Sequence, residues 1–564
     1  MKKLSLLLLA LLSLLPTFAQ NKDTDHNFTV AKNLETFNAI YKALDMIYVD
    51  TLDANEVVGT GINAMLQSLD PYTVYYPEED ANDLDMMLSG KYAGIGAVIR
   101  YSVSLGSTII DQPYEGMPAA IAGLKKGDII LSIDDTTMVG KGTDYVRNHL
   151  RGDAGTSIMI KIKRPATGKV MKLKVTRQSI KLPAIPYYGL QDDGIGYLYL
   201  NSFTEGCAKE FRRAFLDLRR QGMKAFVLDL CDNGGGSLAE AVDIVNMFVP
   251  KNIMLVQTRG KLKRVNRDYK TTVEPVDTVM PMVVLVNNGT ASASEITCGS
   301  LQDLDRAVVL GTRTYGKGLV QVPIDLPYNG NLKLTTSKYY IPSGRCIQAI
   351  NYKHSRGGYT EHVPDSLTHL FHTAHGREVR DGGGIKPDLE VKDDSVSNIV
   401  YYLAGIGRDS TEVLLNWELD YIKNHKTIAP AKSFQLSDAD FEDFKQKVIK
   451  SGFKYDRESG KYLESLVKVA KFEGYYDDAK AEFDALEKKL SHNIAKDLDY
   501  NKASIMKMLT SDIVEAYYFQ RGALENGLQF DKRWKAAADL LHDSERYNSL
   551  LRPVVTQMPN TEKQ

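Results

Sequence analysis

The chain has little cysteine and almost no net charge. Its 564 residues include four cysteines, and 70 lysines and arginines stand against 71 aspartates and glutamates, for a net charge of -1. This balance gives no overall attraction to nucleic acid or to an anionic lipid surface, so we expect no nucleic-acid partner. The cysteines are spaced too widely for a zinc motif or a small disulfide framework, and we expect mostly buried free thiols. They are Cys207, Cys231, Cys298 and Cys346.

The sequence also lacks the HExxH motif of many zinc peptidases. Three histidines, His369, His372 and His375, lie close together in "HLFHTAHG", but no acidic or cysteine ligand pattern accompanies them. The sequence therefore does not favour a metal site or a metal-dependent mechanism.

Long hydrophobic runs are absent except near the N-terminus. Residues 4–15 form a short apolar run that follows two lysines and precedes the small-residue sequence "TFA". This layout is typical of a secretory signal peptide, which we place at residues 1–20 with cleavage near Ala19 or Gln20. No cysteine follows the run, so we expect no lipid anchor. No later stretch approaches the roughly 18 apolar residues of a membrane-spanning helix. We expect an exported protein without a transmembrane segment, located in the periplasm of a cell with an outer membrane.

Along the rest of the chain, composition and periodicity predict four regions. Residues 28–70 space their apolar side chains as helices do, within an N-terminal helical region that we place at residues 21–90. Residues 91–180 contain short β-rich runs between turns, which predicts a small module with its own sheet. Residues 181–395 alternate buried strands with helices, which predicts an α/β domain. Residues 396–564 are helical and charged.

The stretch "GTRTYGKGLVQ" almost spells a nucleotide-binding P-loop, because Gly311 is followed after four residues by Gly316 and Lys317. A P-loop then needs a serine or threonine and a helix, whereas residue 318 is glycine and the residues after it are strand-like. We therefore reject the nucleotide interpretation. Lys317 could instead be a surface lysine in a glycine turn, or a catalytic base whose pKa is lowered by burial in apolar surroundings.

A catalytic lysine needs a hydroxyl to deprotonate, and "NNGTASASE" supplies two candidates. Ser292 and Ser294 follow a buried strand at the predicted start of a helix. Either could simply cap that helix, a position that serine favours. The same position would also expose a nucleophile at the carboxyl edge of the sheet, beside helix amides that can stabilise an oxyanion. The local sequence leaves both roles open.

Gln321 falls on the same side of a strand as Lys317 by the two-residue period. In an extended strand their Cα atoms would be roughly 13 Å apart, so contact requires a bend or inward-reaching side chains, which the glycines beside Lys317 permit. Residues 307–310 and 319–320 could supply apolar walls around the lysine.

The segments "VNNGTASASEITCGSLQD" and "RAVVLGTRTYGKGLVQ" resemble the core of the C-terminal processing (tail-specific) serine peptidases. The resemblance implies a crotonase-like α/β protease core and a serine–lysine–glutamine arrangement that needs no metal or cofactor. It places the nucleophile on Ser292, the general base on Lys317 and the lysine-orienting group on Gln321, and it makes Ser294 a helix residue. The resemblance spans about residues 35 to 392 and includes the family's N-terminal helical region; the remaining residues carry no such motif.

The segment "LDLCDNGGG" resembles the family's aspartate–leucine–arginine–x–asparagine–x–glycine–glycine sequence. By this resemblance, backbone amides of Gly235 and Gly236, together with the amide of Ala293, form the oxyanion hole. Cys231 stands where arginine is usual. This departure puts any arginine-dependent support of the loop in doubt, but not the serine–lysine pair.

The segments "YAGIGAVI" and "KKGDIILSID" resemble a PDZ domain, which adds an extended peptide to a sheet edge and holds its terminal carboxylate in a backbone nest. The amides of Gly94, Ile95 and Gly96 are the candidates for that nest, although these glycines could merely form a tight turn. Arg151 could pair with Asp153 or contact the protease part, and the sequence does not decide between them.

Two functions from different classes fit these observations. The first is an exported serine endopeptidase that binds the C-terminal tails of unfolded or C-terminally exposed proteins and cuts them through an acyl-enzyme. The alternative is a non-catalytic, PDZ-containing peptide-binding scaffold. The complete set of Ser292, Lys317 and Gln321 favours the peptidase. The final helices could serve dimerisation or substrate guidance, so a homodimer is possible.

Overall fold

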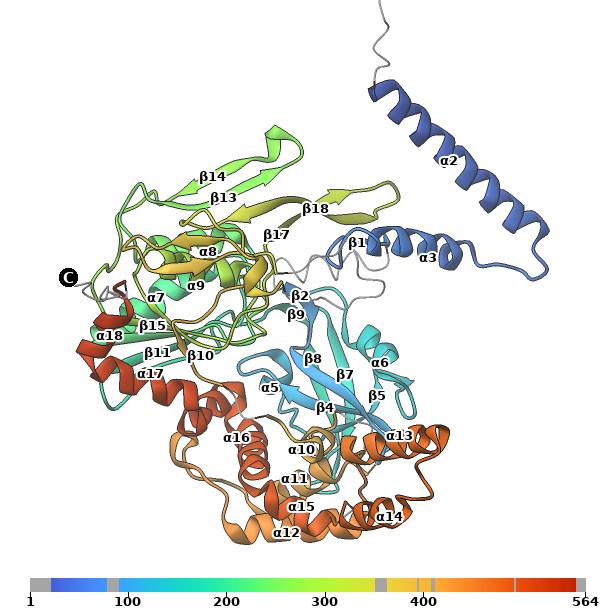
Figure 1. Cartoon of the computed structure of the whole chain (residues 1–564). Helices are drawn as coiled ribbons and strands as arrows, with labels where there is room; N and C mark the ends of the chain where they lie inside the picture. Colours follow the sequence, from blue (N-terminus) through green and yellow to red (C-terminus); the bar gives the residue numbers. More distant parts are fainter. Residues whose placement is uncertain are drawn as a thin grey trace, which may run out of the picture. The chain divides into compact units, whose positions relative to one another are not determined.

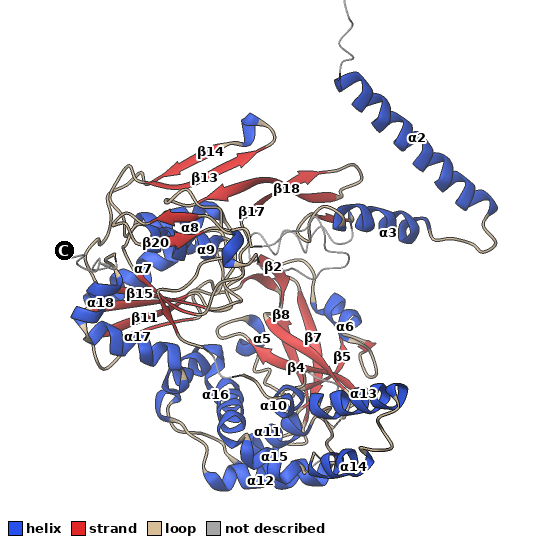
Figure 2. Cartoon of the chain, in the orientation of Figure 1, coloured by secondary structure: helices blue, strands red, loops and turns tan. Residues whose placement is uncertain are grey.

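The computed structural model describes the chain in six segments (Figures 1 and 2). They are residues 22–78, 91–349, 363–392, 395–406, 411–490 and 493–553. The predicted signal peptide, residues 1–20, lies outside these segments. The chain divides into two compact units, residues 1–75 and 76–564. No helix within the described segments is long and apolar enough to span a membrane.

Within its described residues, 22–75, the first unit contains helices α2 (Lys22–Ile47) and α3 (Ala54–Gln67). Asp53 begins α3, because its side-chain oxygen accepts hydrogen bonds from two backbone amides of the first turn at 2.8 and 3.0 Å. Strand β1 (Val74–Tyr76) lies at the boundary between the units.

A β-rich module follows in the second unit. Its sheet has the order β3–β4–β5–β7–β8, with β6 paired to β5, and β2 pairs separately with β9. Ile158, Ile160 and Ile162 of β7 enter the module's core, as expected of a strand with one buried face. The elements are β2 (Lys91–Gly94), β3 (Ala97–Ser102), β4 (Ser107–Pro113), α5 (Pro118–Ile121), β5 (Ile129–Ile133), β6 (Thr136–Thr137), α6 (Thr143–Leu150), β7 (Ser157–Lys163), β8 (Val170–Thr176) and β9 (Gln178–Lys181).

The α/β core is built on a six-stranded sheet of order β10–β11–β12–β15–β16–β21, in which only the β10–β11 pair is antiparallel. Every residue of β12 and β15 is buried, because helices cover both faces of the sheet. The strands are β10 (Tyr187–Leu190), β11 (Ile195–Tyr199), β12 (Ala225–Asp229), β15 (Met282–Val286), β16 (Val308–Gly311) and β21 (Leu389–Glu390).

Alternate residues of the buried strands enter two different hydrophobic clusters. Phe226 and Leu228 face helices α7 (Cys207–Arg220), α8 (Leu238–Asn246) and α9 (Ala293–Asp303). Val227 and its sheet neighbours face the other side, where side chains of the C-terminal helices complete the cluster. The sheet is therefore the middle layer of three.

A second, antiparallel sheet carries β14 (Arg267–Lys270), β13 (Met254–Gly260), β18 (Asn331–Tyr340) and β17 (Leu319–Asp325), paired in that order. A hairpin of β19 (Leu370–His372) and β20 (Glu378–Arg380) lies farther along the chain. Strands β17 and β18 matter for function, because both contribute residues to the cavity described below.

The remaining chain is helical (Figure 2). Trp417 and Phe444 are fully buried at the centre of a hydrophobic core that belongs to these helices alone. The last helices leave this core and join the central sheet. The helices are α10 (Asn398–Leu403), α11 (Val413–Asn424), α12 (Asp438–Ser451), α13 (Glu458–Glu473), α14 (Lys480–Lys489), α15 (Ile494–Tyr500), α16 (Lys502–Gly527), α17 (Lys532–His542) and α18 (Ser544–Leu550).

Candidate active site

Ser292 stands at the turn between buried strand β15 and helix α9. Its φ is 58°, in the left-handed region that non-glycine residues rarely occupy, and such strain gathers at functional sites. The preceding loop is rigid, because Thr290 Oγ1 donates to the carbonyl of Leu230 at 2.8 Å and accepts from the backbone of Asn287 at 2.9 Å. Ser294 is different: it is fully buried within α9, and its Oγ donates to the carbonyl of Asn233 at 2.9 Å.

Lys317 lies in the loop between β16 and β17, beside two glycines that the fold requires. Gly316 has a φ of +88°, and a Cβ there would lie 2.2 Å from Ala349 Cβ. A Cβ on Gly318 would lie 2.8 Å from the backbone nitrogen of Gln348. The glycines thus allow a neighbouring segment to press against the lysine loop, which holds it in place.

A buried carboxylate joins the two loops. Glu295 is fully buried, and its oxygens accept hydrogen bonds from the backbone amides of Ser292, Gly316 and Lys317 at 2.9, 2.7 and 2.8 Å. The hydroxyl of Thr314 donates a fourth, at 2.6 Å. Burial raises the pKa of the Glu295 carboxyl, and these hydrogen bonds act in the opposite direction. One side chain therefore sets the spacing between the Ser292 and Lys317 loops.

Tyr339 of β18 makes a second connection. Its hydroxyl donates to the carbonyl of Lys317 at 2.7 Å and lies 3.2 Å from the carbonyl of Ser292. The ring is only 1% exposed. The backbones of both candidate residues are therefore fixed by side chains that the sequence analysis did not single out.

Gln321 lies on β17 just after an irregularity in the register with β18, between Val320 and Gln321. Such an irregularity bends a strand locally, and a bend was one of the two ways in which the sequence allowed Gln321 to approach Lys317. The Nε2 of Gln321 donates to Thr335 Oγ1 at 3.1 Å, which orients the amide from the neighbouring strand.

Ser292, Lys317 and Gln321 line one cavity of about 720 Å³. Leu319 and Val320 form part of its apolar wall, as expected. Residues 307–310 were expected there too, but this expectation was wrong, because they lie in the hydrophobic clusters of the central sheet. The other lining residues are Ser202, Glu205, Gly234, Gly235, Gly236, Ser237, Leu238, Glu240, Ala293, Ile296, Pro323, Lys333 and Tyr339.

The glycine loop after β12 lies against the serine. A Cβ on Gly235 would lie 2.8 Å from Ser292 Cβ, and one on Gly236 would lie 2.5 Å from the carbonyl oxygen of Phe203. The amide of Gly235 donates to Asn233 Oδ1 at 2.9 Å. The amide of Gly236 is therefore the better candidate of the two to donate a hydrogen bond to a substrate oxyanion. Ala293 is the first residue of α9, where backbone amides have no acceptor within the helix.

Asn233 holds this loop to the serine loop. Its Nδ2 donates to the carbonyl of Leu200 at 2.6 Å, and its own carbonyl accepts from the backbone of Ala291 at 3.0 Å. The side chain is fully buried, so these hydrogen bonds are strongly favoured over an unpaired amide.

The β-rich module carries a separate cavity of about 480 Å³ between edge strand β3 and helix α6. Gly94 and Ile95 line it, and Gly96 turns the chain with a φ of +71° at its entrance to β3. Arg151 lies 5.8 Å from the ring centre of Tyr92, which also lines the cavity, so the structure places this arginine at the groove. An unpaired strand edge beside a helix suits an added peptide strand.

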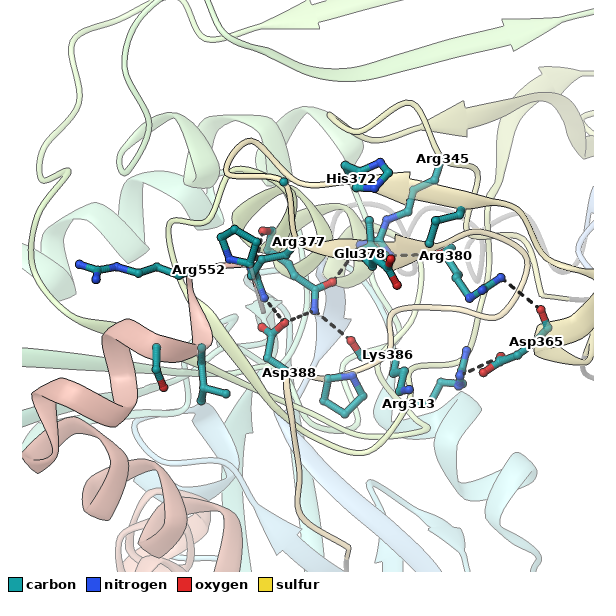
Figure 3. A pocket seen from close by; sticks show the side chains of 18 residues that line it. Arg313, Arg345, Asp365, His372, Arg377, Glu378, Arg380, Lys386, Asp388 and Arg552 are labelled. Atoms are coloured by element: carbon teal, nitrogen blue, oxygen red, sulfur yellow. Dashed lines mark hydrogen bonds and ion pairs between the residues drawn. The ribbon is translucent and has the colours of Figure 1, made fainter. Parts of the chain in front are cut away.

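A third cavity, of about 580 Å³, lies apart from these (Figure 3). It shares no lining residue with the Ser292 cavity, and many of its charged side chains are paired with each other. Figure 3 shows Arg377 bound to Asp388, at 2.5 Å, and Arg313 beside Asp365, at 3.2 Å. We therefore interpret the charged residues around this cavity as a structural network of ion pairs.

The cysteine expectation is confirmed, since all four cysteines are free and three of them are buried. Within the described segments, no group of histidine, cysteine, aspartate and glutamate side chains could hold a metal ion. Two of the three clustered histidines instead lie beside different aspartates. His369 Nδ1 lies 3.0 Å from Asp381 Oδ2, and His375 Nδ1 lies 3.5 Å from Asp305 Oδ2.

Comparison with known proteins supplies the family. A sequence profile of peptidase family S41 matches residues 194–354, and a PDZ-domain profile matches residues 109–164. A profile described as the C-terminal helical domain of a probable PDZ-protease matches residues 400–541. A carboxy-terminal-processing protease of Bartonella bacilliformis is 36% identical over 336 residues, which are 59% of this chain and 76% of that protein. The chain belongs to peptidase family S41.

Two further proteins are similar to parts of this chain. The carboxy-terminal processing protease CtpA of Bacillus subtilis is 32% identical over 316 residues, 56% of this chain and 66% of that protein. Among solved structures, a photosystem II D1 C-terminal processing protease aligns with 63% of this chain and 92% of its own at 26% identity, with a TM-score of 0.35. As an S41 member the chain is a serine-type peptidase with a PDZ domain and a helical C-terminal region.

The S41 assignment confirms the resemblance stated from the sequence, and it removes support from the non-catalytic scaffold. The profile for the C-terminal helices also covers a region in which the sequence analysis found no motif. Of the residues missed, Glu295 had a readable signal, since a glutamate three residues after a serine at a helix start forms a capping pattern.

Proposed function

We propose that this S41 peptidase is an exported endopeptidase that binds protein C-terminal tails on its PDZ domain and cuts the chain with Ser292 and Lys317. The observation that carries the assignment of these residues is the shared carboxylate of Glu295, which accepts backbone hydrogen bonds from both loops. A lysine loop held to a serine loop in this way, over a common cavity, suits a base that must meet one hydroxyl.

In the proposed reaction, Lys317 takes the proton of Ser292 as the serine oxygen attacks a peptide carbonyl. The developing negative charge on the carbonyl oxygen is stabilised by backbone amides, for which Gly236 and Ala293 are the preferred donors and Gly235 the third candidate. Lys317 then gives the proton to the departing amine. Water, deprotonated by the same lysine, hydrolyses the acyl-enzyme and frees Ser292.

Gln321 is proposed to orient Lys317. Its amide is held from the side by Thr335, so it presents a fixed dipole to the cavity that it shares with the lysine. The proposal also includes a crotonase-like arrangement of the α/β core, and the domain limits given above, at residues 20, 90, 180 and 395, stay predictions.

The PDZ domain is proposed to hold the substrate's terminal carboxylate at Gly94, Ile95 and Gly96, with the tail added along β3. A tethered tail raises the effective concentration of the neighbouring chain at the active site, commonly to about the millimolar range. Unfolded or C-terminally exposed proteins are therefore the proposed substrates. Export by a signal peptide, a periplasmic location and a homodimer belong to the same proposal.

The test is digestion of an unfolded protein with an apolar C-terminus by the mature chain, with mass spectrometry of the fragments. Cleavage by wild type and by Ser294→Ala, but not by Ser292→Ala or Lys317→Ala, is the expected result. Cleavage by Ser292→Ala would refute the assignment. Ser294→Ala is the matched control, because it removes a neighbouring hydroxyl that is bound to Asn233.

A further inference from the structure

The C-terminal helices α17 and α18 lie against the central sheet (Figure 1). Helix α17 contacts β15 and β16, the strands that lead to the Ser292 and Lys317 loops. The hydroxyl of Tyr547 on α18 reaches the backbone of Met282, donating to its carbonyl at 3.0 Å and accepting from its amide at 2.9 Å. A region far along the chain is thus fixed directly to a strand that carries the active site.

From α17, a short series of contacts leads to the glycine loop. The ring of Trp534 meets the ring of Tyr197 edge-on, with centres 5.6 Å apart and planes at 90°. The hydroxyl of Tyr197 donates to Asp229 Oδ2 at 2.6 Å, and Asp229 Oδ1 accepts from the backbone amide of Cys231 at 2.8 Å. Tyr197 and Asp229 are only 3% and 5% exposed, so water cannot readily replace either hydrogen bond.

Cys231 opens the loop whose later residues touch Ser292. Two residues later, the side-chain oxygen of Asn233 accepts a hydrogen bond from the backbone amide of Gly235. The backbone of Gly235 packs so closely against Ser292 that there is no room for a Cβ. A shift at Cys231 would therefore pass to the amides beside the nucleophile. Because catalytic geometry is sensitive on the scale of about 1 Å, such a shift would slow the chemical step.

Arg533, the residue before Trp534, acts electrostatically on the first residue of the same loop, Cys231. Cys231 replaces the arginine expected at its position, and burial raises the pKa of its thiol. The positive charge of Arg533, on α17, acts on the pKa of that thiol in the opposite direction.

We propose that Trp534 and Tyr197 are positioning residues of the peptidase, through which the C-terminal helices hold the oxyanion loop beside Ser292. This inference rests on the proposed function. It gives the helical region a role in the chemical step, whereas substrate binding takes place elsewhere, on the PDZ domain and in the cavity.

Steady-state kinetics on the full-length chain test this inference, with Tyr197→Phe, Trp534→Leu and Trp534→Phe as variants. Tyr197→Phe and Trp534→Leu should lower kcat about 10- to 100-fold and change KM less than about twofold. Trp534→Phe keeps an aromatic edge on Tyr197 and should restore most of kcat. Binding of a PDZ peptide, measured in parallel, should be unchanged and so shows that each variant is folded.

Trp417→Leu is the matched control, because Trp417 is also buried in the C-terminal helices but belongs to their separate core. It should lower Tm yet leave kcat within about twofold of wild type. Unchanged kcat in Tyr197→Phe and Trp534→Leu would overturn the inference, as would an equal loss in Trp417→Leu. An inactive wild type would overturn the proposed function and this inference with it, whereas unchanged kcat in an active background would overturn this inference alone.

Discussion

The backbone amide of Lys317 donates a hydrogen bond of 2.8 Å to the fully buried carboxylate of Glu295. Because Glu295 lies on α9 only three residues after Ser292, this bond ties the candidate base to the helix that begins at the candidate nucleophile. The distance between two loops 25 residues apart in sequence is thereby set by one short side chain.

Glu295→Gln should therefore reduce activity strongly, although the two side chains are nearly the same size. The amide keeps one acceptor oxygen but turns an NH2 group toward backbone donors, which leaves buried N–H groups unpaired at a cost of about 1–3 kcal/mol. We expect a lower free energy of unfolding in denaturant titration and a kcat reduced by at least about tenfold. Glu418→Gln is the control, since Glu418 is also buried but pairs with Lys126, and neither residue lines the Ser292 cavity. An equal loss of kcat there would contradict the account.

Gly316→Ala tests whether the lysine loop must be tightly held. The new Cβ would lie 2.2 Å from Ala349 Cβ at a φ of +88°, so the loop must move. Gly376→Ala introduces similar backbone strain, at a φ of +90°, but meets no atom within 4 Å. Both should lose about 1–2 kcal/mol from strain alone. Only Gly316→Ala should lower kcat, by at least about tenfold; equal kcat values in the two variants would show that the loop position is unimportant.

The groove of the PDZ domain should distinguish free carboxylates from amides. A fluorescent peptide with an apolar, free C-terminus should bind at least about tenfold more tightly than its amidated form, as measured by fluorescence anisotropy. In Gly96→Ala a Cβ would lie 2.5 Å from Met117 Cβ at a φ of +71°, and this variant should lose the preference. Gly116→Ala, at a φ of +70° with no atom within 4 Å, should keep it. A preference that survives in both variants would place the carboxylate elsewhere.

We expect the free energy of unfolding to depend on pH because of Asp512, a buried carboxyl on α16 near Glu418 of α11 and Lys126 of the PDZ domain. Burial, and then the charge of Glu418, raise the pKa of Asp512 well above its usual range, while Lys126 acts in the opposite direction. The charge of Glu515 also raises the pKa of Asp512, and Asp111 raises the pKa of the Lys126 ammonium. A carboxyl whose pKa is higher in the folded state favours its protonated form, so its contribution to stability is greatest below its unfolded pKa, about 3.9.

That contribution is lost as the pH rises through the raised pKa of Asp512. Asp512→Asn should therefore make the free energy of unfolding fall less steeply between acid and mildly alkaline pH. Urea titrations of both proteins across this range measure the difference. An unchanged slope would mean that Asp512 titrates normally in the folded chain.

Much of the site could be predicted from the chain itself. Short motifs around Ser292, Lys317 and Gln321 carry the resemblance to the peptidases, and the structure brings these three residues to one cavity. The distance between Lys317 and Gln321 predicted either a bend or inward-reaching side chains, and a register irregularity lies between Val320 and Gln321. These features depend on local sequence, where spacing and glycine positions are directly readable.

The missed features depend on contacts between distant residues. Nothing near Tyr339 indicates that its hydroxyl will reach Lys317, and the contact between Tyr197 and Trp534 joins residues more than 300 positions apart. The sequence placed the oxyanion-hole amides on Gly235 and Gly236 but could not choose between them. The choice depends on the hydrogen bond from Gly235 to Asn233, which only the three-dimensional structure shows. The expectation for residues 307–310 was wrong for a related reason, since an apolar strand can serve a core as readily as a cavity.

The most direct test of the central claim is the site of acylation. The enzyme is mixed with a slowly hydrolysed acylating substrate, quenched in acid, digested and mapped by mass spectrometry. The account predicts the acyl mass on the peptide containing Ser292, in wild type and in Ser294→Ala, and no acylation in Ser292→Ala or Lys317→Ala. An acyl group on another residue, or acylation that persists without Ser292, would contradict it.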